Sequence, residues 1–111
     1  MINDILMDTL TPVISNVYPD VYIGQDTEYM TFSYDIQPKL SADNDAWVLD
    51  YMVTLQYFAP LEKNGLDKRI AILNAIRYME GAGLPTETND TDKDGQHYYY
   101  TFVYSEYPEG E

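Results

Sequence analysis

The chain has 111 residues with 19 acidic and 6 basic side chains, which gives a formal net charge of −13 at pH 7. A surface this acidic repels phosphate backbones, so a DNA- or RNA-binding domain is excluded. The absence of cysteine excludes disulfides, thiol nucleophiles and Cys-ligated zinc. A hydrophobic fraction of 45% suffices for one small core, and we expect a single domain over residues 1–111.

A short first helix is predicted near the start of the chain, with Asn3 as its N-cap, because apolar residues recur at helical spacing at Ile2, Ile5, Leu6 and Leu10. Pro12 either ends this helix or starts a further turn. Residues 18–24 predict a turn followed by a short extended piece. A half-buried strand is predicted from Tyr29 to Ile36, because apolar and polar residues alternate there. Its apolar side comprises Met30, Phe32, Tyr34 and Ile36.

Turn-forming residues from Pro38 to Ala46 predict a loop, and loops of this kind often carry contacts. A long strand from Trp47 to Tyr57 follows and is closed by Pro60. One face of that strand is apolar and the other is mixed. The apolar face consists of Trp47, Leu49, Tyr51, Val53, Leu55 and Tyr57.

The main amphipathic helix is predicted to start at Leu66 and to end before Gly81-Ala82-Gly83. Residues 86–88 and 97–107 predict two strands joined by the acidic turn 89–95. The expected fold class is α+β, with a mainly antiparallel sheet of about four strands packed against two helices as a two-layer sandwich. The apolar face of the main helix comprises Leu66, Ile70, Ile72, Leu73, Ile76 and Met79.

The segment from Asp90 to Gly95 matches the first six positions of a calcium-binding loop. The twelfth position is Thr101 rather than Glu, so a β-hairpin turn is the favoured interpretation and a cation site at Asp90, Asp92 and Asp94 is the alternative. His97 is the only histidine, which leaves it without partners for a triad or a zinc pair. We therefore expect no enzymatic activity and no cofactor.

Four of the six basic residues, Lys63, Lys68, Arg69 and Arg77, lie on or beside the main helix. They form either a solvated face or a positive patch that meets the acidic surface of another copy. The last strand places Tyr98, Tyr100, Phe102 and Tyr104 on one face and Tyr99 and Tyr107 on the other. We expect part of this aromatic surface to be core and the remainder to contact a partner protein.

The order and spacing of these segments resemble the tail-terminator or tail-completion proteins of long-tailed bacteriophages and prophages, which act in head-tail joining. The likeness spans nearly the whole chain. It is carried by the amphipathic start from Ile5 to Tyr18, the strands beginning at Tyr29 and Trp47, the helix from Lys68 to Ile76 running into Gly81-Ala82-Gly83-Leu84, and the closing strand from His97 to Phe102.

The resemblance implies a non-enzymatic virion protein of the tail or neck, assembled in the bacterial host cytoplasm. It implies a ring, expected to be a hexamer, that caps the tail tube, ends its polymerisation and contacts the head-completion or connector protein. DNA would only pass through the ring, which is consistent with the acidic composition. Alternatives are a head-closure or neck protein of the same assembly, an acidic calcium-dependent protein-binding module, and a DNA mimic.

The N-terminal residues lack the features of a signal peptide and no run is long enough to span a membrane, so a soluble intracellular chain without a membrane partner is expected. Contacts between subunits are expected from the loop 39–46 and the hairpin 92–95. The candidate interface residues are Lys39, Asp43, Asp45, Lys68, Arg69, Arg77, Asp92, Asp94, Tyr99 and Tyr107.

Overall fold

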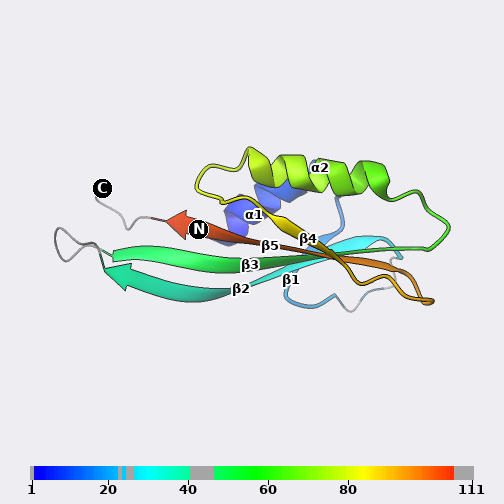
Figure 1. Ribbon diagram of the computed structural model, residues 1–111, viewed down its shortest axis with the longest axis horizontal. Helices are drawn as coiled ribbons and strands as arrows, with labels where there is room; N and C mark the ends of the chain where they lie inside the picture. Colours follow the sequence, from blue (N-terminus) through cyan, green and yellow to red (C-terminus); the bar gives the residue numbers. More distant parts are fainter. Residues whose placement is uncertain (1, 23, 25–26, 41–46, 107–111) are drawn as a thin grey trace.

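The computed structural model describes residues 2–22, 24, 27–40 and 47–106 and contains two helices and five strands in this part of the chain. Within these residues the elements follow an α-β-β-β-α-β-β order (Figure 1). Their bounds are α1 (Ile2–Leu10), β1 (Val17–Pro19), β2 (Tyr29–Leu40), β3 (Trp47–Ala59), α2 (Leu66–Arg77), β4 (Thr86–Asn89) and β5 (Gln96–Glu106).

The five strands form one sheet in the order β1-β2-β3-β5-β4, in which β1 runs parallel to β2 and all other neighbours are antiparallel. The expected α+β fold is confirmed, with one strand more than the predicted number. The additional strand, β1, comes before the turn and not after it as the sequence suggested. Asp20 makes that turn with a positive φ of 64°, a conformation that Asp adopts more readily than most residues.

Both helices lie on the same face of the sheet, so the molecule has two layers (Figure 1). The core between the layers is formed by the inward side chains of α1 and α2 and by alternate residues of β2, β3 and β5. The largest fully buried side chains are Tyr57, Tyr100, Phe32, Leu6, Leu10, Met30, Leu55, Ile72, Ile76 and Val53.

The β2–β3 hairpin extends beyond the helices as an arm (Figure 1). β2 runs through Pro38 to Leu40, so the first residues of the predicted loop belong to a strand. Ile36 shares a face with the fully buried Met30 but is 54% exposed, because the helices do not cover this part of the sheet. The radius of gyration is 15.3 Å, against about 13 Å expected for a compact chain of this length, which reflects the arm.

Pro38 fits into β2 because β1 pairs only with residues 30–32, which leaves the described part of β2 beyond them at the edge of the sheet. An edge strand tolerates the missing proline N–H.

At the N-terminus, Asn3 lies inside α1 and is not its N-cap; its Oδ1 accepts a hydrogen bond of 2.6 Å from the Tyr34 hydroxyl. The helix stops before Pro12, as the first of the two alternatives predicted.

The packed face of α2 differs from the predicted one. Ile72 and Ile76 are buried as expected, but Leu66 and Ile70 are about half exposed at 52% and 48%. The stripe facing the sheet begins instead at Arg69, which lies one turn before Ile72 and pairs with a carboxylate on β4. A charged residue thus takes a position that periodicity alone gives to an apolar one, and the apolar residues beside it turn outward.

Candidate interaction surface

A continuous row of aromatic rings crosses the face of the sheet that the helices leave uncovered. Successive ring centroids are 4.4, 4.5, 4.7, 4.2 and 4.5 Å apart. Every member is partly exposed. In spatial order the row is Tyr18 of β1, Tyr22, Tyr29 of β2, Phe58 of β3, and His97 and Tyr99 of β5.

Strand register explains how the row forms. Tyr29 pairs with Phe58 across β2 and β3, and Phe58 pairs with His97 across β3 and β5. Paired residues point to the same side of a sheet, so the three rings meet although they are distant in the sequence. Phe58 is stacked between the other two at interplanar angles of 22° and 18°. Each such contact contributes about 0.5–1.5 kcal/mol beyond burial.

His97 is fixed in this row by polar neighbours. Its Nε2 lies 2.9 Å from Gln56 Oε1 and its Nδ1 lies 3.5 Å from Asp90 Oδ2. Its backbone N–H donates to the Thr91 hydroxyl at 3.1 Å. The only histidine is therefore held by a neighbouring strand and by the β4–β5 turn, and these contacts orient the ring within the aromatic row.

A hollow of about 490 Å³ opens beside the row, between the β3–α2 connection and the β4–β5 turn. Tyr29, Phe58 and His97 line it, together with three carboxylate-bearing residues. All three acidic residues are exposed. They are Glu62, Asp92 and Asp94.

The β4–β5 turn forms one side of this hollow. Asp92 and Gly95 pair across it, and Asp92 Oδ1 accepts a hydrogen bond of 2.8 Å from the Asp94 backbone N–H. The hairpin interpretation is confirmed. Among the described residues, no cluster of His, Cys, Asp or Glu side chains is arranged to hold a metal ion, so the cation site at Asp90, Asp92 and Asp94 gains no support.

Glu28 lies between Thr27 and Tyr29, which both line the hollow, and forms its own polar contacts with neighbouring segments. Its carboxylate accepts hydrogen bonds from the Tyr57 hydroxyl at 2.5 Å and from Lys63 Nζ at 2.7 Å. Burial acts to raise the pKa of Glu28, but the hydrogen bonds from Lys63 and Tyr57 and the charges of Lys63 and Lys68 outweigh it and lower the pKa. This charged brace ties the start of β2 to β3 and to the β3–α2 connection.

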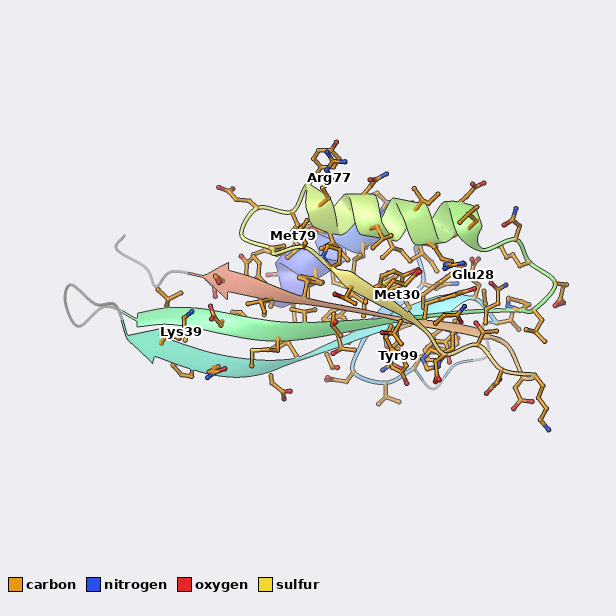
Figure 2. The ribbon with its side chains drawn as sticks, viewed as in Figure 1. Glu28, Met30, Lys39, Arg77, Met79 and Tyr99 are labelled. Atoms are coloured by element: carbon orange, nitrogen blue, oxygen red, sulfur yellow. The ribbon has the colours of Figure 1, made fainter. Side chains whose placement is uncertain are left out.

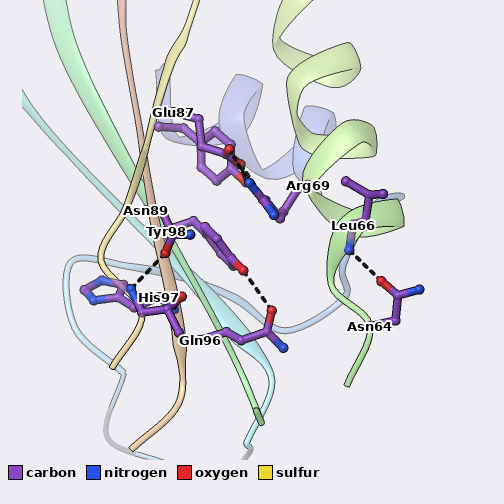
Figure 3. A network of polar contacts seen from close by, with 10 residues as sticks. Asn64, Leu66, Arg69, Glu87, Asn89, Gln96, His97 and Tyr98 are labelled. Atoms are coloured by element: carbon purple, nitrogen blue, oxygen red, sulfur yellow. Dashed lines mark hydrogen bonds and ion pairs between the residues drawn. The ribbon is translucent and has the colours of Figure 1, made fainter. Parts of the chain in front are cut away.

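On the helix side of the sheet, Arg69 links α2 to β4 (Figure 3). Its Nε and Nη2 donate to the two Glu87 oxygens at 3.0 and 2.8 Å, and the Tyr100 hydroxyl donates to Glu87 at 2.6 Å. The guanidinium also lies 4.3 Å from the centre of the Tyr98 ring. The hydrogen bond from Arg69 lowers the pKa of Glu87; burial opposes this effect and the Tyr100 hydroxyl reinforces it.

Gln96 closes the same side of the molecule. Its Oε1 accepts from the Tyr98 hydroxyl at 2.9 Å (Figure 3), and its Nε2 donates to the carbonyls of Pro60 and Lys63 at 2.7 and 2.6 Å. A buried glutamine thereby fastens β5 to the β3–α2 connection next to the hollow.

The predicted interface residues do not gather in one place. Lys39 forms an ion pair of 3.0 Å with Asp50 on the arm, and Lys68 donates to the Val13 carbonyl. Arg69 is used inside the fold, whereas Arg77 is exposed. Tyr99 joins the aromatic row, and Asp92 and Asp94 border the hollow. Asp43, Asp45 and Tyr107 lie outside the described residues.

Sequence reasoning missed most of the row and the whole hollow. The predicted interface residues do not include Tyr18, Tyr22, Tyr29, Phe58 or His97. The available signal was that Phe58 directly follows the predicted strand and continues the alternation of its mixed face. The expectation that part of the last strand is core is confirmed, since Tyr98, Tyr100, Phe102 and Tyr104 are all buried.

Comparison of the chain with models of known protein families and with curated proteins finds no match. Among the described residues, neither helix has the length and apolar character needed to cross a membrane. A function for this chain is therefore inferred from its aromatic row and the adjoining hollow.

Proposed function

We propose that the chain is a structural subunit of a long-tailed bacteriophage, which forms a ring on the end of the tail tube, ends tube growth and joins the tail to the head connector. The observation that carries the proposal is the uncovered sheet face, with its aromatic row and adjoining hollow. Tyrosine-rich surfaces of this kind suit contacts with other proteins, since Tyr combines a large apolar ring with a polar tip.

The arm supports an assembly role. It projects beyond the helices (Figure 1) and exposes Ile36 on the face that elsewhere forms the core. A projecting hairpin with an open edge can reach a neighbouring subunit or the tube and add contacts far from the body of the chain. The resemblance of the segment order to tail-terminator proteins supplies the identity of that assembly.

The charge distribution is compatible with a channel for DNA. Three of the six basic side chains, those of Lys39, Lys63 and Arg69, are already paired with carboxylates, which leaves a predominantly acidic surface. An acidic channel wall offers no cations to displace the counterions of DNA, so the duplex would pass without being held. His97 is held in place by Gln56 and Asp90, which also agrees with a structural role and not a catalytic one.

The test is to mix the purified chain with the tube protein encoded in the same genome. We expect rings by light scattering and electron microscopy, and tubes that carry one ring at an end and no longer elongate. Binding to the connector without binding to tubes would instead indicate the head-closure role. A chain that binds neither component would contradict the proposal.

The uncovered face gives this test a matched pair of variants. Tyr99→Ala removes the last ring of the row, and Thr101→Ala alters an exposed position two residues further along the same face of β5. We expect Tyr99→Ala to weaken tube capping and Thr101→Ala to leave it unchanged. Equal activity of both variants would show that the row does not contribute to capping.

A further inference from the structure

Arg77 differs from most of the other basic residues of the chain. All six basic residues are described, and Lys39, Lys63 and Arg69 form ion pairs with carboxylates while Lys68 donates to a carbonyl. Arg77 is exposed, and within the described residues its guanidinium contacts the Tyr78 ring, 5.3 Å from the ring centre, without a carboxylate partner.

Tyr78 itself is 77% exposed at the end of α2, so an arginine and a tyrosine project together from the surface. These two residue types are strongly enriched among the side chains that dominate protein interfaces. We refer to Arg77 and Tyr78 as the knob.

The hollow has the complementary chemistry. Its lining includes the aromatic residues Tyr29 and Phe58 and the exposed acidic residues Glu62, Asp92 and Asp94. Both faces of Phe58 are covered by its stacked neighbours, so these rings act by excluding water, and the carboxylates supply the partners for a guanidinium. Lys93 lies in the same turn but does not line the hollow, and the three carboxylates outnumber it.

Building on the proposed ring, we propose that the knob of one copy docks in the hollow of the next copy. The two features lie apart: Figure 2 shows Arg77 on the outer side of α2, whereas Tyr99, at the end of the aromatic row, lies on the other side of the sheet. A contact between two different surfaces is heterologous, and repeated head to tail it closes into a ring when the rotation allows. A two-fold dimer would require both features in one patch.

Charge complementarity favours a second copy as the occupant. Copies with a net charge of −13 repel one another, so their association needs a place where a positive group meets a negative surface. The knob provides that group and the hollow provides that surface on the same chain.

The first experiment compares dissociation constants by analytical ultracentrifugation. Arg77→Gln combined with Tyr78→Ala should weaken self-association by about 30-fold or more, which corresponds to the loss expected for a dominant interface residue. Ser15→Glu, in an exposed turn, lowers the net charge by the same one unit as Arg77→Gln and should leave association unchanged. Melting temperatures should match the wild type, because the altered side chains are exposed.

The second experiment tests the head-to-tail geometry by mixing two variants. One lacks the knob through Arg77→Glu and Tyr78→Ala, and the other lacks two acidic lining residues of the hollow through Glu62→Lys and Asp94→Lys. Each should remain monomeric alone. Mixed together they should form one-to-one dimers that grow no further, since only one intact knob and one intact hollow remain.

The outcomes separate this contact from the proposed function. Rings that persist in the knob variant would overturn the contact and leave the ring itself standing. Rings that depend on the contact but never bind tubes would overturn the tail role and leave the contact standing. A mixture that stays monomeric, or a wild-type chain without self-association at any concentration, would overturn the contact.

Discussion

Buried tyrosines paired with carboxylates are the recurring unit of this molecule. The hydroxyls of Tyr57, Tyr100 and Tyr51 donate to Glu28, Glu87 and Glu106 at 2.5, 2.6 and 2.9 Å. A buried tyrosine ring needs an acceptor for its hydroxyl, and a carboxylate at the margin of the core supplies a strong one. Part of the tyrosine and acid content that the sequence suggested for partner contacts therefore serves the interior.

Glu87→Gln should destabilise the fold by about 1–2 kcal/mol, because it removes the charge that Arg69 and Tyr100 bind at a largely buried site. The pKa of Glu87 is lowered below its ordinary value of 4.5. Its stabilisation is therefore complete above that value and is lost as the pH falls through the folded-state pKa.

Urea unfolding of both proteins from pH 7 to pH 3 measures this effect. The difference between wild type and Glu87→Gln should shrink in the acid range. Glu62→Gln, at an exposed position, should change stability by less than about 0.5 kcal/mol at neutral pH. A gap between wild type and Glu87→Gln that does not depend on pH would contradict the assignment.

Tyr51 gives the corresponding prediction at alkaline pH. Burial and the hydrogen bond to Glu106 raise its pKa from 10.0 to about 12. The stabilisation from this hydroxyl is complete below pH 10 and is lost as the pH rises towards 12. Tyr51→Phe should cost about 1 kcal/mol at pH 7, and the cost should decline over that interval in denaturant titrations. A cost that stays constant through the interval would show that the hydroxyl is not the titrating group.

At the scale of elements, the connection from α2 to β4 is more ordered than its glycines suggested. Gly81 adopts a φ of +90°, after which Ala82 pairs with Tyr104 and the Gly83 N–H donates to the Val103 carbonyl at 2.8 Å. The connection thus runs beside β5 before β4 begins, and a single positive-φ glycine allows the change of direction.

Gly81→Ala should destabilise the fold by about 1–3 kcal/mol, because alanine tolerates a positive φ poorly. Its Cβ would also lie 3.0 Å from the Ser105 carbonyl oxygen. Gly83→Ala is the matched control, since its Cβ would meet the Val103 carbonyl at an ordinary 3.5 Å. Thermal unfolding should separate the two variants clearly, and equal melting temperatures would show that the backbone at Gly81 relaxes freely.

Elements whose signal is local could be predicted from the sequence, and those set by tertiary contacts could not. The alternation in β3 and the spacing in α1 describe single segments, and both were predicted correctly. The face of α2 depends on the pairing of Arg69 with Glu87, which spacing cannot reveal. The aromatic row depends on register across four strands, and the hollow on three segments that meet only in the fold.

At the scale of the whole molecule, excess negative charge and an elongated shape act together. The extents are 53 × 24 × 22 Å, so the arm carries part of the chain away from the body. Three carboxylate ion pairs formed by Lys39, Lys63 and Arg69 act against a net charge of −13. Salt weakens both the ion pairs and the general repulsion, and the balance between them decides how stability responds.

Raising the ionic strength from about 0.01 M to about 0.15 M shortens the screening length from about 30 to about 8 Å, which is less than the radius of the molecule. Repulsion among the excess carboxylates then falls by a few kcal/mol more in the compact state than in the expanded unfolded chain. Surface ion pairs lose at most about 1 kcal/mol each, so repulsion dominates and salt should stabilise the fold.

The expected result is a rise in melting temperature of at least about 5 °C over this range. Calorimetry at a fixed low protein concentration keeps self-association out of the measurement. The same scan on Lys39→Gln, which removes one exposed cation, should start from a lower melting temperature at low salt and converge on the wild type as salt is added. A melting temperature that falls with salt would mean that the loss of the ion pairs outweighs the relief of repulsion among the excess carboxylates.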